Sequence, residues 1–166
     1  MKKLFLPFSL FASAAFAGTP PNVGDKAPAF TAATDTGRVK LSDYAGQKHV
    51  VLYFYPKDFT PGCTAESCDF RDNIAGLGKL DAVVFGVSYD SVESHKKFVE
   101  HHKLTFGLIA DMDHKVSEAY GVAKENVCSR ATFIIGKDGK IAWRNLAVKP
   151  KEAVAEVRAA LEQLNK

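Results

Sequence analysis

The chain of 166 residues has few cysteines, no marked excess of either charge and no apolar run of membrane-spanning length after its amino end. Three cysteines are far too few for a disulfide scaffold, and their odd number leaves at least one thiol without a partner in the chain. A membrane helix needs roughly 20 apolar residues in succession. With no internal repeat or low-complexity tract either, the chain is expected to form one domain that buries its own core.

The amino end carries the features of an export signal. Two lysines precede a largely apolar stretch over residues 4–16, and Ala15-Phe16-Ala17 fits the small-x-small rule for signal peptidase. The stretch is too short for a membrane anchor, and Gly18-Thr19-Pro20-Pro21 would stop a buried helix at once. We therefore expect cleavage after Ala17, export to the periplasm or a similar compartment, and a mature domain over residues 18–166.

Charge in this mature domain is nearly balanced. The full chain has 22 basic and 19 acidic residues, and removal of the two leader lysines leaves 22 − 2 = 20 basic residues against the same 19 acidic ones. Proteins that bind nucleic acid usually present a strong basic excess. The composition therefore predicts neither a nucleic-acid partner nor, once the leader is removed, attachment to a membrane.

Strand and helix patterns alternate along the rest of the chain. A β-hairpin is expected over residues 30–41, turned by Asp35-Thr36-Gly37. Further strands are expected at 49–55, 82–88, 106–110, 131–135 and 141–144, and helices at about 64–77, 91–102, 115–120 and 150–164. Alternation requires crossovers and a largely parallel core, and the closing hairpin must add an antiparallel strand. The pattern indicates a thioredoxin-like α/β fold, a central mixed sheet flanked by helices, with an amino-terminal β-hairpin extension.

Cys63 lies where the loop after a buried strand meets the start of a helix. The run Val50–Tyr55 suits a central strand covered on both faces, and Pro56 ends it. Open α/β sheets place their sites beyond the carboxyl ends of such strands. A helix amino end offers free N–H groups and a positive dipole, and both favour the thiolate over the thiol. Cys63 is therefore the candidate nucleophile.

If the target of Cys63 were a peroxide, the site would also require groups that hold one oxygen near sulfur and stabilise charge on the other. Thr60, three residues before Cys63, can supply a hydroxyl group. Pro61 has no N–H and can wall the pocket. Arg130, just before the strand expected at 131–135, is the candidate cation.

The segment from Phe54 to Thr64, FYPKDFTPGCT, resembles the active-site signature of the peroxiredoxin Q group, also called bacterioferritin comigratory proteins. The likeness runs from Gly24–Phe30 through Arg130–Ile135 to the last helix, and so covers nearly all of the mature chain. It implies a thioredoxin fold and reduction of hydrogen peroxide and organic hydroperoxides. It also implies no metal or haem cofactor, a thioredoxin-like protein reductant and a monomer.

The same resemblance assigns roles by matching positions. Cys63 becomes the peroxidatic cysteine, with Thr60 and Arg130 as its activating partners and Pro61 as its shield. Glu66, three residues after Cys63, matches the acid that orients the arginine network.

Cys68 matches the resolving cysteine found in part of the group, which implies a redox disulfide between Cys63 and Cys68. Cys128 has no counterpart in the pattern and is expected to be a small buried residue. Export also departs from the group, whose familiar members are cytosolic, so the reductant of this chain would have to be an exported one.

Two other classes of function stay open at this point. An exported thiol–disulfide oxidoreductase on the same fold would carry Cys-x-x-Cys at the helix start, whereas four residues separate Cys63 from Cys68. A non-enzymatic binding domain would use the same two cysteines as a structural disulfide. His95, His101 and His102 could suggest a metal, but histidines scattered over a helix are usually solvated, and no metal site is expected.

Overall fold

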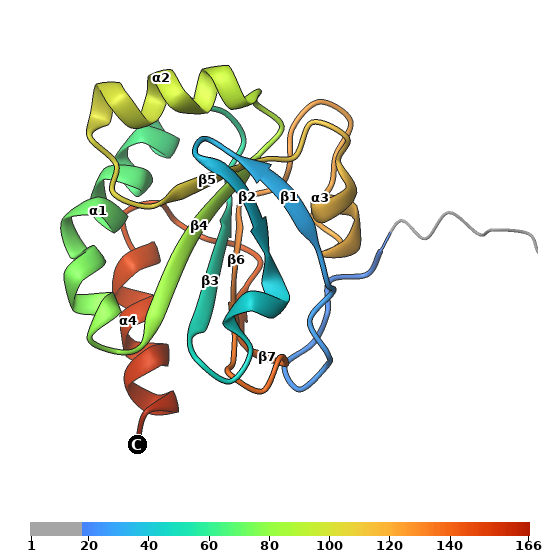
Figure 1. The fold of residues 1–166 in the computed structure, drawn as a ribbon, viewed down its shortest axis with the longest axis vertical. Helices are drawn as coiled ribbons and strands as arrows, with labels where there is room; N and C mark the ends of the chain where they lie inside the picture. Colours follow the sequence, from blue (N-terminus) through green and yellow to red (C-terminus); the bar gives the residue numbers. More distant parts are fainter. Residues whose placement is uncertain (1–17) are drawn as a thin grey trace, which may run out of the picture.

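Seven strands form one mixed sheet in the computed structural model, which describes residues 18–166 (Figure 1). The strands are β1 (Thr31–Thr34), β2 (Gly37–Lys40), β3 (His49–Phe54), β4 (Ala82–Ser88), β5 (Gly107–Ala110), β6 (Ala131–Ile135) and β7 (Ile141–Asn145). Their order in the sheet is β2-β1-β5-β4-β3-β6-β7. β3, β4 and β5 run parallel, whereas the β1–β2 hairpin and the β6–β7 hairpin join antiparallel. The predicted mixed sheet with an amino-terminal hairpin is confirmed; the predicted export signal, residues 1–17, lies outside the described residues.

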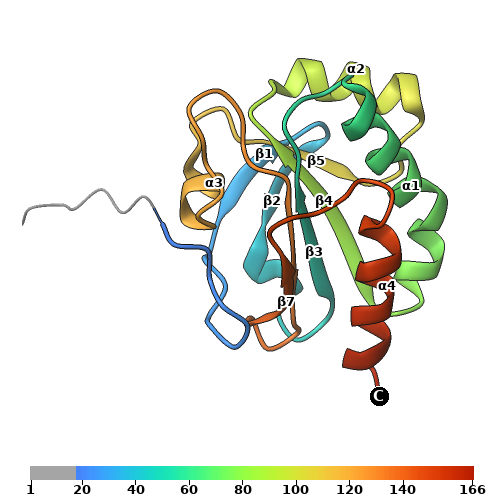
Figure 2. The ribbon, with the colours of Figure 1, turned by 180° about the vertical axis from the view of Figure 1, so that it is seen from behind.

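Helices cover both faces of this sheet. They are α1 (Pro61–Gly78), α2 (Val92–His102), α3 (Lys115–Ala119) and α4 (Ala153–Leu164), and a 3-10 turn, η1, covers Leu41–Tyr44. Figure 2 shows α1 and α4 side by side over one face, with α3 on the opposite side. Within residues 18–166 no helix has the length and apolar content to cross a membrane.

The central strand β3 separates two apolar cores. All six of its residues are buried, and neighbouring side chains point to opposite faces. Tyr53 joins the core under α1, α2 and α4, whereas Leu52 and Phe54 join the core under the hairpin and α3. Burial on both faces explains why the apolar run is continuous instead of alternating.

Two helix starts differ from the sequence-based expectation. α1 begins at Pro61 and not near Thr64, because proline has no N–H to leave unpaired and its fixed φ suits the first helical position. α4 begins at Ala153 and not at Pro150, because a tight turn comes first, in which the N–H groups of Glu152 and Ala153 both bond to the carbonyl of Lys149. The first difference matters for function, since it places Cys63 inside the helix.

Candidate active site

Cys63 occupies the third position of α1, directly beyond the carboxyl end of β3. Thr60, with φ −85° and ψ 149°, is the extended residue that precedes the helix, and its carbonyl accepts the N–H of Thr64 at 2.9 Å. The N–H groups of Gly62 and Cys63 precede that first bond and have no partner within the helix. The Cys63 thiol is 1% exposed, so these donors and the helix dipole act on it in a place largely shielded from water.

Arg130 reaches the same point from the start of β6. Its Nη2 donates to Cys63 Sγ at 3.3 Å, and its Nη1 pairs with Glu66 Oε2. Burial works against the cation, but Glu66 and Cys63 together raise the pKa of Arg130. The structure thus brings together three residues that the sequence separates by up to 67 positions, and a fixed cation beside sulfur favours the thiolate.

Glu66 lies in the second turn of α1 with its side chain fully buried. One carboxylate oxygen faces Arg130, and the other, Oε1, has no hydrogen-bond partner among residues 18–166. Burial raises the pKa of Glu66 to about 7, although Arg130 opposes the shift. The carboxyl group therefore fixes the guanidinium on one side while the other side faces Cys63.

The hydroxyl of Thr60 lies on the loop side of the site. It donates to the carbonyl of Lys57 at 2.7 Å, so its proton is engaged and its oxygen lone pairs are left to accept. The next residue, Pro61, takes the first helical position and presents no N–H. Both residues therefore lie at the start of α1, two and three positions before Cys63.

The three cysteines are unpaired thiols in this structure. Cys68 is half-buried and lies on the same regular helix as Cys63. Five residues of ideal α-helix place the two Cα atoms roughly 8–9 Å apart and turn the side chains to different sides. A disulfide requires a Cα separation of about 4.4–6.8 Å. The two thiols cannot form a bond while this part of α1 stays wound.

Cys128 belongs to the core on the other face of the sheet. It is fully buried, and its thiol donates to the carbonyl of Tyr55 at 3.1 Å. Burial raises the pKa of the Cys128 thiol to about 12. The expectation of a small buried residue is confirmed, and such a thiol is a poor nucleophile.

One histidine departs from the sequence-based expectation. His95 is not solvated: it is fully buried under the loop that leads to Cys63, with Nδ1 at 2.8 Å from Asp58 Oδ2. The signal was its place on the same face of α2 as Val92 and Val99, a face that packs inward. Within the described residues no group of three or more potential ligands is placed to hold a metal ion.

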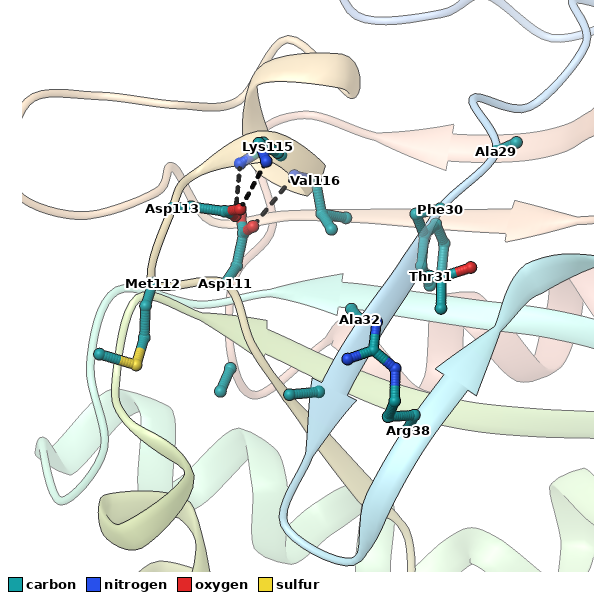
Figure 3. A pocket seen from close by; sticks show the side chains of 12 residues that line it. Ala29, Phe30, Thr31, Ala32, Arg38, Asp111, Met112, Asp113, Lys115 and Val116 are labelled. Carbon is teal, nitrogen blue, oxygen red and sulfur yellow. Dashed lines mark hydrogen bonds and ion pairs between the residues drawn. The ribbon is translucent and has the colours of Figure 1, made fainter.

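A pocket of about 530 Å³ lies elsewhere, between β1 and the loop after β5 (Figure 3). Its carboxylates are already engaged, because Asp111 accepts the N–H of Val116 at 3.0 Å and Asp113 pairs with Lys115 at 3.1 Å. None of the residues predicted to act on peroxide lines it. The residues predicted to act on peroxide lie instead around the start of α1.

Fold and site together define a class: a thioredoxin-like domain with a buried, arginine-paired cysteine in the first turn of a helix. Residues 23–144 match the AhpC/TSA family, and the chain belongs to it. It is 48% identical over 154 residues to Peroxiredoxin Bcp of Bacillus subtilis (strain 168), covering 86% of this chain and 96% of that protein. It is 41% identical over 131 residues to Peroxiredoxin Bcp of Escherichia coli (strain K12), covering 74% and 83%.

Solved structures agree with these relatives. A cysteine-to-serine mutant of Xylella fastidiosa PrxQ superimposes with a TM-score of 0.84 at 32% identity, covering 90% of this chain and all of that one. Xanthomonas campestris peroxiredoxin Q gives a TM-score of 0.79 at 33% identity, covering 82% and 92%. The resemblance to the peroxiredoxin Q group and the thioredoxin-like fold are both confirmed, and the chain is a peroxiredoxin.

Proposed function

We propose that this enzyme reduces hydrogen peroxide and organic hydroperoxides through a sulfenic acid on Cys63, which Cys68 then resolves. The observation that carries the proposal is the contact of 3.3 Å between Arg130 Nη2 and the buried sulfur of Cys63 at the start of α1. Family membership supports thiol-dependent peroxidase activity in general. The roles of individual residues are part of the proposal, and the geometry around Cys63 supports them.

In the first step, the Cys63 thiolate attacks the nearer peroxide oxygen, the S–O bond forms and the O–O bond breaks. The leaving oxygen takes a proton and departs as water or an alcohol, so Cys63 is oxidised by two electrons and the peroxide is reduced. Arg130 and the free N–H groups of the first helical turn stabilise the negative charge that moves between the two oxygens. Thr60 accepts a hydrogen bond from the peroxide, and Pro61 keeps water from the sulfur.

Organic hydroperoxides are included for two reasons. The site needs only a terminal O–O group within reach of Cys63, because the groups proposed to bind substrate are the guanidinium of Arg130 beside the sulfur and the hydroxyl of Thr60, and both suit oxygen atoms. A bacterioferritin comigratory protein of Xanthomonas campestris, 32% identical to this chain, is described by its alkyl peroxide reduction activity.

In the second step, the Cys68 thiol loses its proton and attacks the sulfur of the sulfenic acid; the S–S bond forms, the S–O bond breaks, and the hydroxyl group leaves with a proton as water. The first turns of α1 must unwind for this attack, because the wound helix keeps the two cysteines apart. Helix ends open more readily than helix centres, so the first turns of α1 are the part of the helix that unwinds most readily. The proposal thus contains two states. With the start of α1 wound, Cys63 reacts with peroxide; with it unwound, the disulfide is accessible to the reductant.

The reductant in this proposal is an exported thioredoxin-like protein, and the enzyme acts as a monomer. What supports export is the leader over residues 1–17 together with the cut expected after Ala17. Mass spectrometry of the native protein should find an amino end at Gly18. Recovery of the chain from the cytoplasm with Met1 in place would contradict export and would make a cytosolic thioredoxin the natural donor.

The central experiment mixes the reduced protein, residues 18–166, with stoichiometric hydrogen peroxide and no disulfide substrate. Wild-type protein should consume the peroxide, and Cys63→Ser should not. Undiminished consumption by Cys63→Ser would refute the assignment of the nucleophile. Peroxide consumption without a disulfide substrate also distinguishes the proposal from a thiol–disulfide oxidoreductase, which would be inert in this assay.

A further inference from the structure

We propose that His95 is a positioning residue of the peroxidase site, which holds the loop before Cys63 in place through the carboxylate of Asp58. The inference rests on the proposed peroxide reaction at Cys63. It concerns a residue that lies on α2, 32 positions further along the chain, and that does not contact the reacting atoms. Its effect reaches them through the loop alone.

The loop over residues 55–60 has to be held, because its own conformation is unfavourable. Phe59 adopts a left-handed backbone with φ 60°, which costs a bulky residue about 1–3 kcal/mol. Its ring is 50% exposed and packs edge-on against Phe98, so burial alone does not enforce this backbone. The next residue, Thr60, directly precedes α1, and a shift of this loop would move its hydroxyl relative to Cys63.

Asp58 is the point at which the loop is fixed. The residue is 4% exposed, and its carboxylate accepts three hydrogen bonds: from Tyr55 Oη at 2.7 Å, from Ser94 Oγ at 2.7 Å and from the His95 ring at 2.8 Å. Burial would raise the pKa of Asp58, but these bonds, led by that of His95, lower it overall. The anion is thus stabilised inside the protein, two residues before Thr60.

His95 connects that anion to the sheet. Its side chain is fully buried; Nδ1 faces Asp58 Oδ2, and Nε2 lies 3.1 Å from the carbonyl oxygen of Ile109 in β5. Asp58 Oδ2 and the carbonyl oxygen of Ile109 are both acceptors, so each contact is a hydrogen bond when the ring nitrogen facing it carries a proton. Burying a carboxylate and an imidazole together is a costly way to gain stability, because both polar groups give up water. The geometry instead indicates that the His95 ring forms a rigid link between β5 and the loop over residues 55–60.

Two substitutions of similar volume test the two contacts of the His95 ring separately. In His95→Asn the amide nitrogen takes the place of Nδ1 and keeps the bond to Asp58. In His95→Gln the amide nitrogen takes the place of Nε2 and keeps the bond to Ile109. If positioning acts through Asp58, the rate constant of Cys63 with hydrogen peroxide should fall about 10- to 100-fold in His95→Gln, the loss typical of a misplaced group. It should stay within about threefold of wild type in His95→Asn.

A second readout separates positioning from general damage to the fold. Alkylation of Cys63 by iodoacetamide depends on the thiolate that Arg130 and the helix favour, and it needs no alignment with Thr60. The alkylation rate should therefore stay near the wild-type value in His95→Gln while the peroxide rate falls. Equal losses in both rates, or equal peroxide rates in His95→Asn and His95→Gln, would overturn the proposal.

Asp58→Asn keeps the inference testable if the His95 variants fail to fold. It should lower the peroxide rate by the factor of about 10- to 100-fold expected of His95→Gln. Where His95→Gln does fold, the double variant should lose no more than either single one, because both act through one contact. Additive losses would overturn the inference. If wild-type protein did not react with peroxide at Cys63, the proposed function would be refuted. If wild-type protein reacted and Asp58→Asn reacted at the same rate, only the inference about His95 would be refuted.

Discussion

A buried hydrogen bond between β3 and α1 should govern how fast oxidised Cys63 is resolved. Tyr53 Oη and Ser67 Oγ lie 2.9 Å apart, and both residues are fully buried. Ser67 directly precedes Cys68, so any unwinding that delivers Cys68 to Cys63 pulls Ser67 away from Tyr53. We expect Ser67→Ala to accelerate formation of the disulfide.

The size of the effect follows from the group left behind. In Ser67→Ala the hydroxyl of Tyr53 has no partner while α1 is wound, and an unsatisfied buried group costs about 1–3 kcal/mol. Unwinding admits water and removes that cost. The higher helix propensity of alanine opposes the effect by about 0.5 kcal/mol. The net shift of about 0.5–2.5 kcal/mol makes the unwound state about 2- to 60-fold more populated, at 1.4 kcal/mol per factor of ten.

Tyr53→Phe is the matched control. It removes the same hydrogen bond but leaves the Ser67 hydroxyl, which can turn to a carbonyl one turn back in its own helix. No buried donor is then left unpaired, and the acceleration should be smaller than in Ser67→Ala. The ring of Tyr53 stacks on Phe70 with centroids 4.6 Å apart, a contact that phenylalanine preserves.

The assay is a single turnover with hydrogen peroxide, quenched at intervals and resolved by mass spectrometry into thiol, sulfenic acid and disulfide. Loss of the thiol should proceed at the wild-type rate in both variants, whereas the sulfenic acid should disappear faster in Ser67→Ala. Less sulfinic acid should accumulate at high peroxide, since the sulfenic acid is exposed for a shorter time. Unchanged or slower disulfide formation in folded Ser67→Ala protein would refute the reasoning.

Four further outcomes are expected. Arg130→Met and Thr60→Val should each keep the fold and slow the peroxide step by about 10²-fold or more, the scale of one lost transition-state contact, and unchanged stopped-flow rates would show the roles to be misassigned. Cys68→Ser should react once with peroxide, form no intramolecular disulfide and over-oxidise readily, as mass spectrometry would show; normal recycling would contradict it. Amide hydrogen exchange over residues 63–70 should lose protection on oxidation, and equal protection in both redox states would exclude unwinding. Glu66 has its pKa raised from 4.5 to about 7 by burial, so between these values the unfolded chain releases a proton that the folded chain keeps, and stability falls as pH rises. Glu66→Gln should flatten that decline in urea titrations between pH 5 and 7, and an unaltered slope would assign it to another group.

The local features of the site could be predicted from the sequence. The apolar run of β3, the proline that ends it and the cysteine at the next helix all follow from residue types and spacing. The start that residue spacing predicts for α1, near Thr64, is too late, although a proline at the first helical position is a known signal. With that later start Cys63 would lie just outside the helix, whereas it lies in the first turn.

The long-range features could not be predicted from spacing. Arg130 lies 67 residues from Cys63; its place before a strand makes it a candidate cation, and the resemblance to a known family is what assigns it a role beside the thiol. His95 and Asp58 are 37 residues apart, and neither alone indicates a buried pair. Such contacts depend on the order of strands in the sheet, which brings α2 and β5 beneath the loop and which residue spacing does not specify.

The division of the interior into two cores has a consequence for redox fidelity. Three thiols allow three pairings, yet Cys128 belongs to one core and Cys63 to the other, with the sheet as a wall between them. Unwinding of the start of α1 would expose the core that contains Cys63 and leave the core that contains Cys128 covered. If Cys63 and Cys68 cycle through a disulfide as proposed, we expect Cys128 to take no part in the exchange, because its thiol stays fully buried in the other core and bonded to the carbonyl of Tyr55.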